Sequence, residues 1–214
     1  EDMPIMHINT FDLENAIKKH GIDLSTKSFS FREFFRTWTG DLSKDGQPIP
    51  AERKVGDFVH PEAVRRFLDL LSQGSESSKF PYVTKDKCNQ NRHSLWMVPG
   101  VKEAAALSEM LRNHHLFGQK ELFGIANVAG EGDHDEEKNY HNALEHVRKT
   151  IEKHPNSITL SCGRLTTGVT VKEWTSVFML AGSETTDAKN YMQTIFRVQS
   201  AGKSNGVQKK DANV

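Results

Sequence analysis

A polar segment that follows an apolar run is the part of this sequence best suited to chemistry. Residues Thr159 to Thr170 read TLSCGRLTTGVT, and the segment after the run holds one arginine, three threonines and two glycines. Short hydroxyls and backbone amides at the carboxyl end of a strand suit phosphate oxygens, and Gly163 and Gly168 permit a close backbone approach. Solvated threonines in an ordinary strand-to-helix turn have the same composition, so local chemistry leaves both interpretations open.

A second candidate lies near the end of the chain, where residues Asn190 to Ser200 read NYMQTIFRVQS. The stretch favours a helix, and Gln193 and Arg197 are four residues apart, which places them on one helical face. A planar guanidinium held by a rigid helix suits phosphate recognition. A solvated surface arginine is the alternative, because most arginines are exposed.

In their order along the chain, these stretches resemble motifs of the superfamily 2 helicases and translocases. HSLWMVPGVKEAAALSEML is similar to motif IV, TLSCGRLTTGVTV to motif V and YMQTIFRVQ to motif VI. Within that superfamily the likeness is to the motors of restriction enzymes, the type III Res subunit or the type I R subunit. The resemblance covers about residues 91–201. It implies the second, C-terminal RecA-like domain: an α/β, three-layer fold of the P-loop NTPase type with a mainly parallel central sheet.

Motif V of that family contacts the nucleic-acid backbone and the nucleotide. The resemblance places Arg164, Thr166, Thr167 and Gly168 at the nucleic acid, and Gly168 and Thr170 at the nucleotide. Many relatives carry an aspartate where this chain has Thr170. Ribose or relay contacts made by that aspartate therefore lack their usual side chain here.

Motif VI usually reads Gln-x-x-Gly-Arg-x-x-Arg. Gln193 matches its glutamine and Arg197 its first arginine, whereas Phe196 replaces the glycine and Ser200 the last arginine. The last arginine is often the arginine finger, which is worth about 10³–10⁵ in rate in related NTPases. The resemblance thus makes Gln193 and Arg197 the catalytic candidates, with Arg197 also touching the nucleotide. Either Arg197 acts as the finger or another residue supplies it.

The nucleotide-holding half of such a motor is not visible in the sequence. No GxxxxGK[ST] loop occurs, because Gly202-Lys203-Ser204 lacks the leading glycine and follows a helical pattern. No DEAD- or DEAH-type magnesium box occurs either. ATP and Mg²⁺ are therefore expected to be held mainly by a partner N-terminal RecA-like ATPase domain, with DNA and nuclease or methyltransferase subunits or domains as further partners. The full-length protein should hydrolyse ATP, and this chain alone should not.

Composition excludes several classes of protein. Lys+Arg and Asp+Glu are both 28, which argues against a dedicated DNA-coating protein but not against a local basic surface. The cysteines Cys88 and Cys162 form no CxxC pair, and the ten histidines include no HExxH, so we expect no metal site. His114 and His115 form one of the densest histidine groups.

No apolar run approaches the length of a membrane span and no signal peptide is visible, so a cytoplasmic protein is expected.

Strand and helix patterns alternate after residue 92, which predicts βαβ units and a parallel sheet. We expect residues 1–18 to end a preceding motor domain or form a linker, 19–91 to be a helical insertion, 92–201 to be the RecA-like domain and 202–214 to be a polar tail. The expected strands cover 93–98, 122–129, 157–162 and 175–181, and the main helices 61–71, 101–113, 137–153 and 185–198.

Two other functions stay open. A RecA-like domain could serve as a binding or scaffold domain without motor activity, which the missing last arginine of motif VI supports. An unrelated α/β enzyme could use the threonine-rich loop to bind a small phosphate-bearing substrate.

Overall fold

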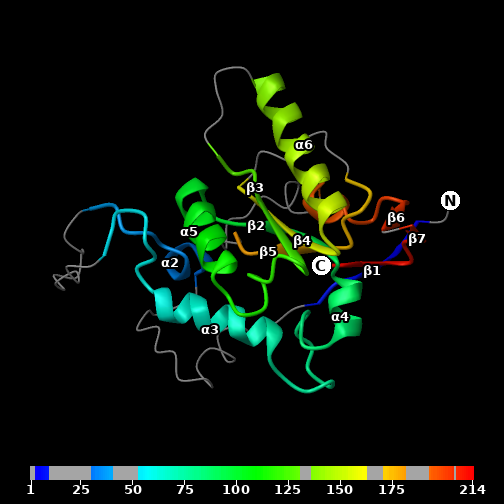
Figure 1. Cartoon of the computed structure of the whole chain (residues 1–214), viewed down its shortest axis with the longest axis horizontal. Coiled ribbons are helices and arrows are strands. Elements are labelled where there is room, and N and C mark those ends of the chain that lie inside the picture. The colour runs from blue at the N-terminus through cyan, green and yellow to red at the C-terminus, as the bar shows by residue number, and fades with distance from the viewer. Residues whose placement is uncertain are drawn as a thin grey trace.

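A parallel sheet of six strands forms the centre of the molecule (Figure 1). The computed structural model describes residues 3–9, 30–40, 53–130, 136–162, 171–181, 193–204 and 206–214. The strand order is β1-β8-β5-β2-β4-β3, and every described pair in this sheet is parallel. The strands are β1 (Ile5–His7), β2 (His93–Met97), β3 (Phe123–Asn127), β4 (Asn156–Ser161), β5 (Ser176–Met179) and β8 (Asp211–Asn213).

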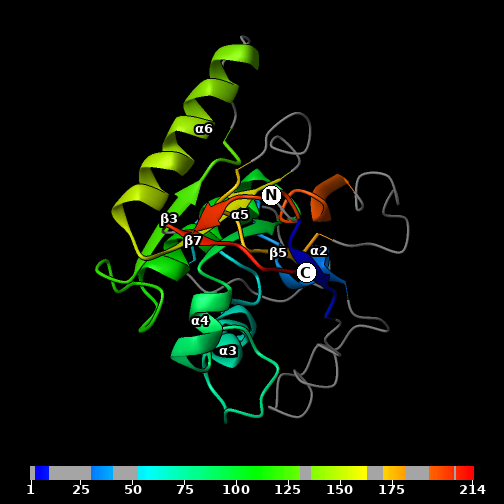
Figure 2. The same ribbon diagram turned by 90° about the vertical axis from the view of Figure 1, so that its right-hand side faces the viewer.

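Helices cover both faces of the sheet, which gives three layers (Figures 1 and 2). One face packs against α2 (Phe31–Phe34), α3 (Pro61–Ser72) and α5 (Val101–Arg112), and the other against α6 (Glu136–Lys153). A short helix, α4 (Lys85–Gln90), precedes β2, and a small antiparallel hairpin joins β6 (Lys203–Ser204) to β7 (Val207–Gln208). No helix among the described residues is long and apolar enough to cross a membrane.

The helices form where the apolar spacing predicts them. Pro61 occupies the first turn of α3, where a missing N–H costs nothing, and Val64, Phe67, Leu68 and Leu71 bury one face of that helix. In α5 the buried positions recur at three- and four-residue intervals in the same way: Ala104, Leu107, Ser108 and Leu111. The apolar residues of both stripes belong to one buried cluster, so α3 and α5 pack against the same face of the sheet.

The central strands are buried on both sides. Every residue of β2 and of β4 is buried, as expected for parallel strands with helices on each face. The prediction of an α/β protein with a parallel central sheet is confirmed by this topology, which is consistent with a Rossmann- or RecA-like arrangement.

The end of the chain differs from the expected polar tail, because residues 211–213 form β8 between β1 and β5. Ala212 is fully buried, whereas Asp211 is exposed and Asn213 is partly exposed. A three-residue strand with one apolar position is too short to produce a periodic signal. The sheet therefore includes strands from both ends of the chain.

The described part of the expected insertion, residues 19–91, contains helices α2, α3 and α4 together with one β-bridge between Thr37 and Phe58. Phe34 and Phe35 are almost fully buried against Phe67. The aromatic-rich segment thus contributes to the same core as the sheet, and the domain boundary near residue 91 stays a prediction.

Candidate functional site

The carboxyl edge of the sheet is the candidate functional site, because parallel α/β sheets bind ligands there. Backbone hydrogen bonds hold the strand ends level: Val98 N donates to Ser161 O (2.9 Å), Val128 N to Leu160 O (3.0 Å) and Leu180 N to Met97 O (2.9 Å). The segments that follow β2, β3, β4 and β5 consequently all leave the sheet at this edge.

The threonine-rich segment leaves from the interior of that edge. It follows β4, which lies between β2 and β3, and Cys162 is its last described residue, with the thiol 3.7 Å from Ala129 O. The predicted nucleic-acid and nucleotide contacts all lie outside the described residues: Arg164, Thr166, Thr167, Gly168 and Thr170. Their roles stay predictions. The strand that precedes them, β4, ends at the carboxyl edge of the sheet, where parallel α/β sheets bind ligands.

The amino end of α5 meets the same edge but is already occupied by a carboxylate. Glu103 lies in the first turn of α5, and its Oε1 accepts a hydrogen bond from Thr37 Oγ1 at 3.2 Å. Its Oε2 lies so close to Gly100 that a Cβ there would sit 2.3 Å away. A helix amino end normally attracts anions. Here Glu103 supplies the negative charge, so triphosphate binding at this helix end is disfavoured.

Gln193 and Arg197 lie in a segment that changes from helix to turns after Ile195, and residues 185–192 of the expected helix lie outside the described residues. Gln193 to Ile195 are helical, and the following residues form turns in which Arg197 N donates to Thr194 O (3.2 Å) and Gln199 N to Phe196 O (3.2 Å). Bonds of this i to i+3 kind wind the chain more tightly than an α-helix. The expected single α-helical face is therefore not formed over this stretch.

Buried neighbours fix the position of this segment. Ile195 and Val198 are fully buried in the apolar cluster on the α6 face of the sheet, together with Trp174. Gln193 is exposed, and Arg197 is partly buried. The threonine-rich segment from Gly163 to Thr170 lies outside the described residues, so its approach to Arg197 stays a prediction.

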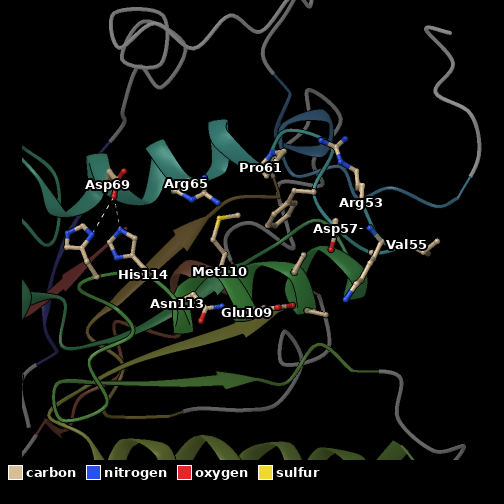
Figure 3. A pocket seen from close by; sticks show the side chains of 16 residues that line it. Arg53, Val55, Asp57, Pro61, Arg65, Asp69, Glu109, Met110, Asn113 and His114 are labelled. Carbon is tan, nitrogen blue, oxygen red and sulfur yellow. Dashed lines mark hydrogen bonds and ion pairs between the residues drawn. The ribbon is translucent and has the colours of Figure 1, made fainter. Parts of the chain in front are cut away.

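A groove of about 880 Å³ runs between α3 and α5 on the opposite face (Figure 3). At one end Asp69 from α3 meets two histidines that follow α5. Asp69 Oδ1 lies 3.0 Å from His114 Nε2 and 3.7 Å from His115 Nδ1. The sequence singled out the two histidines but gave no signal for Asp69, which is 45 residues from His114 along the chain.

These three groups have metal-ligand chemistry, but the hydrogen bonds of His114 oppose it. The amides of Leu116 and Phe117 point at His114 Nδ1, at 3.2 and 3.4 Å, so this nitrogen is the acceptor and the ring proton is on Nε2. A metal-binding histidine usually donates its second N–H instead. His114 thus donates to Asp69 and connects α3 with the end of α5.

We expect His114→Gln to lower the free energy of unfolding by about 1–3 kcal/mol at neutral pH, because a buried hydrogen-bonded group is lost. Burial lowers the pKa of His114 despite the hydrogen bond from its ring to Asp69. The native ring therefore binds fewer protons than the unfolded one. The contribution of His114 to the free energy of unfolding is fully present above its unfolded pKa of about 6.5 and is lost as pH falls through its folded pKa.

Urea unfolding of wild type and variant between about pH 5 and 8 measures this effect. The variant should show a flatter pH dependence on the acid side. A variant that keeps the wild-type dependence of stability on pH would contradict the role assigned to His114.

Comparison with known proteins links the chain to restriction and modification. It is 29% identical over 170 residues to a Mycoplasma pneumoniae protein provisionally named as the C-terminus of a type II restriction enzyme and methyltransferase. The match covers 79% of this chain and 22% of that protein, so the chain spans about a fifth of its relative's length. No protein-family model matches, and no solved structure matches.

Proposed function

We propose that this chain is the C-terminal motor domain of an ATP-dependent DNA helicase or translocase in a restriction-modification system. The observation that carries the proposal is the carboxyl edge of the parallel sheet, where the threonine-rich segment leaves the interior strand β4. Such edges bind phosphate-bearing ligands in open α/β sheets.

The relative supports the restriction-modification part of the proposal. Its provisional name combines a restriction enzyme with a methyltransferase, and the matched region is a small part of a longer protein. The assignment to a motor rests on the resemblance of the two polar segments to motifs V and VI.

The proposal assigns ATP and Mg²⁺ mainly to a partner RecA-like domain. Glu103 at the amino end of α5 supports this division, because its carboxylate would repel a triphosphate at that helix end. The bound nucleotide supplies the free energy for stepping. In this proposal Thr166, Thr167 and Gly168 hold the DNA backbone, and Arg197 stabilises charge at the terminal phosphate with support from Gln193.

Backbone contacts of this kind carry no sequence information, so stepping would be independent of DNA sequence. Nuclease and methyltransferase domains or subunits would supply the sequence-dependent chemistry. The motor would then bring distant DNA to those partners.

The test is ATP hydrolysis by the full-length gene product with and without double-stranded DNA. We expect turnover that DNA stimulates in the full-length protein, and none in this chain alone. Turnover should return when a fragment carrying the partner ATPase domain is added. Full-length protein without DNA-stimulated turnover would contradict the motor assignment.

One observation favours a second candidate, a RecA-like binding domain without motor activity. The segment that holds Gln193 and Arg197 changes from helix to turns after Ile195, so the two side chains do not share an α-helical face. A binding domain predicts DNA or protein association that is indifferent to ATP.

A further inference from the structure

A cationic groove lies beside β3, the strand at the opposite lateral edge of the sheet from β1. It has a volume of about 370 Å³ and lies where the end of α5, the edge strand β3 and α6 meet. Figure 2 shows α6 running alongside β3. Six basic side chains line this groove: Arg112, Lys120, His146, Lys149, Lys153 and His154. Among the described residues, no acidic side chain lines it, although the chain as a whole is electrically balanced.

Packing of α6 onto β3 builds one side of the cationic groove. A Cβ at Gly124 would lie 2.4 Å from His154 Nδ1 and 2.6 Å from the Thr150 methyl group. The last turns of α6 can therefore approach the strand only because Gly124 has no side chain. His154 Nδ1 donates to Thr150 O at 2.9 Å, which holds the ring against the last turns of α6.

Arg112 forms the opposite side, and its position is fixed. Its guanidinium donates to Ser108 Oγ and, at 3.2 Å, to the carbonyl of Ile125 on the edge strand. Burial, with a smaller contribution from Arg112, lowers the pKa of His146. The groove thus combines one fixed guanidinium with lysines that are exposed to solvent.

The cations extend too far for one small anion. Lys149 and Lys153 are four residues apart on α6, so they lie on one face of the helix. At 1.5 Å per residue they are about 6 Å apart along the helix axis. Successive phosphates on a DNA strand are about 3.4 Å apart along the axis, so the two lysines span about two phosphate spacings of one strand.

The open edge of β3 does not favour a peptide strand as the occupant. Arg112 already covers the carbonyl of Ile125, and the amide of Phe123 already donates to Gln119 O at 2.8 Å. A peptide that added itself to the sheet would have to replace both bonds. Phosphodiester oxygens need only the outward-facing cations.

We propose that the cationic groove binds the phosphate backbone of a nucleic acid, as a contact separate from the carboxyl edge of the sheet. This inference goes beyond the proposed motor function, because it requires neither ATP nor a partner domain. It predicts binding without sequence preference and with a strong dependence on salt, since bound phosphates release counterions.

The test is fluorescence anisotropy of this chain with labelled DNA of two unrelated sequences, in a salt titration without nucleotide. We expect the pair Lys149→Gln/Lys153→Gln to weaken binding on the order of tenfold or more at about 0.1 M salt, and to reduce the salt slope by about 2. Both lysines are exposed, so the substitutions should preserve the fold. Circular dichroism verifies this, and Lys149→Arg/Lys153→Arg should retain binding.

A second variant should strengthen binding. Glu145 lies beside the groove and pairs with Lys149, with both side chains largely exposed. Glu145→Gln releases this lysine, so we expect tighter DNA binding by a few fold.

A matched control changes two exposed lysines that do not line the groove. Lys85→Gln/Lys210→Gln removes the same net charge and should have the smaller effect. Equal losses from both pairs, or wild-type binding by the groove pair, would overturn the proposal. So would binding of an acidic peptide that depends on the groove lysines when DNA does not bind. Because the assay contains no nucleotide and no partner domain, its outcome is separate from the test of the motor assignment.

Discussion

We expect Arg197→Ala to lower the DNA-stimulated kcat of the proposed full-length motor by about 10³–10⁵-fold. This is the effect of removing an arginine that stabilises charge on a transferring phosphoryl group in related NTPases. Arg197 is the candidate because Ser200 stands where the motif VI that the sequence resembles has its last arginine. The KM for ATP should change much less, since the interaction is strongest in the transition state.

Steady-state kinetics of three variants measures this prediction. Arg197→Lys keeps the charge but loses the planar fork, so it should recover only part of the rate. Arg148→Ala removes an exposed arginine on α6 and should behave like wild type. Because Ile195 and Val198 anchor the segment, loss of the Arg197 side chain should leave the fold intact. Turnover that is indifferent to Arg197 would remove the catalytic assignment and favour a RecA-like binding domain.

The sequence predicts the sheet and its main helices because burial leaves a periodic signal. The apolar runs near β2 and β4 and the stripes of α3, α5 and α6 all fall where expected, within a few residues. Each signal is local, since a strand or helix buries its own residues at fixed intervals. The order of the strands is harder to predict from the sequence. For example, β8 has only one buried apolar residue, Ala212, which gives no periodic signal.

The sites depend on contacts between distant parts of the chain, which no local pattern encodes. Asp69 and His114 are brought together by the packing of α3 beside α5. The cationic groove draws residues from the end of α5, a loop and α6, and each looks like an ordinary surface charge in the sequence. A count of 28 basic and 28 acidic residues hides this segregation. Spacing along α6 was the one signal that could have revealed it.

Trp96→Ala should destabilise the protein by about 3–5 kcal/mol, because Trp96 is fully buried at the centre of the sheet. Its ring packs against Phe117 and Phe178, with ring centroids 6.2 and 5.2 Å away. Its Nε1 donates to Ser94 Oγ at 2.9 Å, and that hydroxyl also lies 3.0 Å from the hydroxyl of Tyr82. Alanine would leave a cavity and remove a donor from this buried network.

Urea unfolding followed by circular dichroism measures the loss, and Trp96→Phe separates its causes. Phenylalanine fills most of the space but lacks the indole N–H, so its cost should be smaller and should reflect mainly the lost hydrogen bond. Phe196→Ala is the control, because Phe196 is 50% exposed and should change stability by no more than about 0.5 kcal/mol. A loss below about 1 kcal/mol for Trp96→Ala would contradict the central position of β2. Since β2 lies between β4 and β5, it would also contradict the alignment of strand ends at the candidate site.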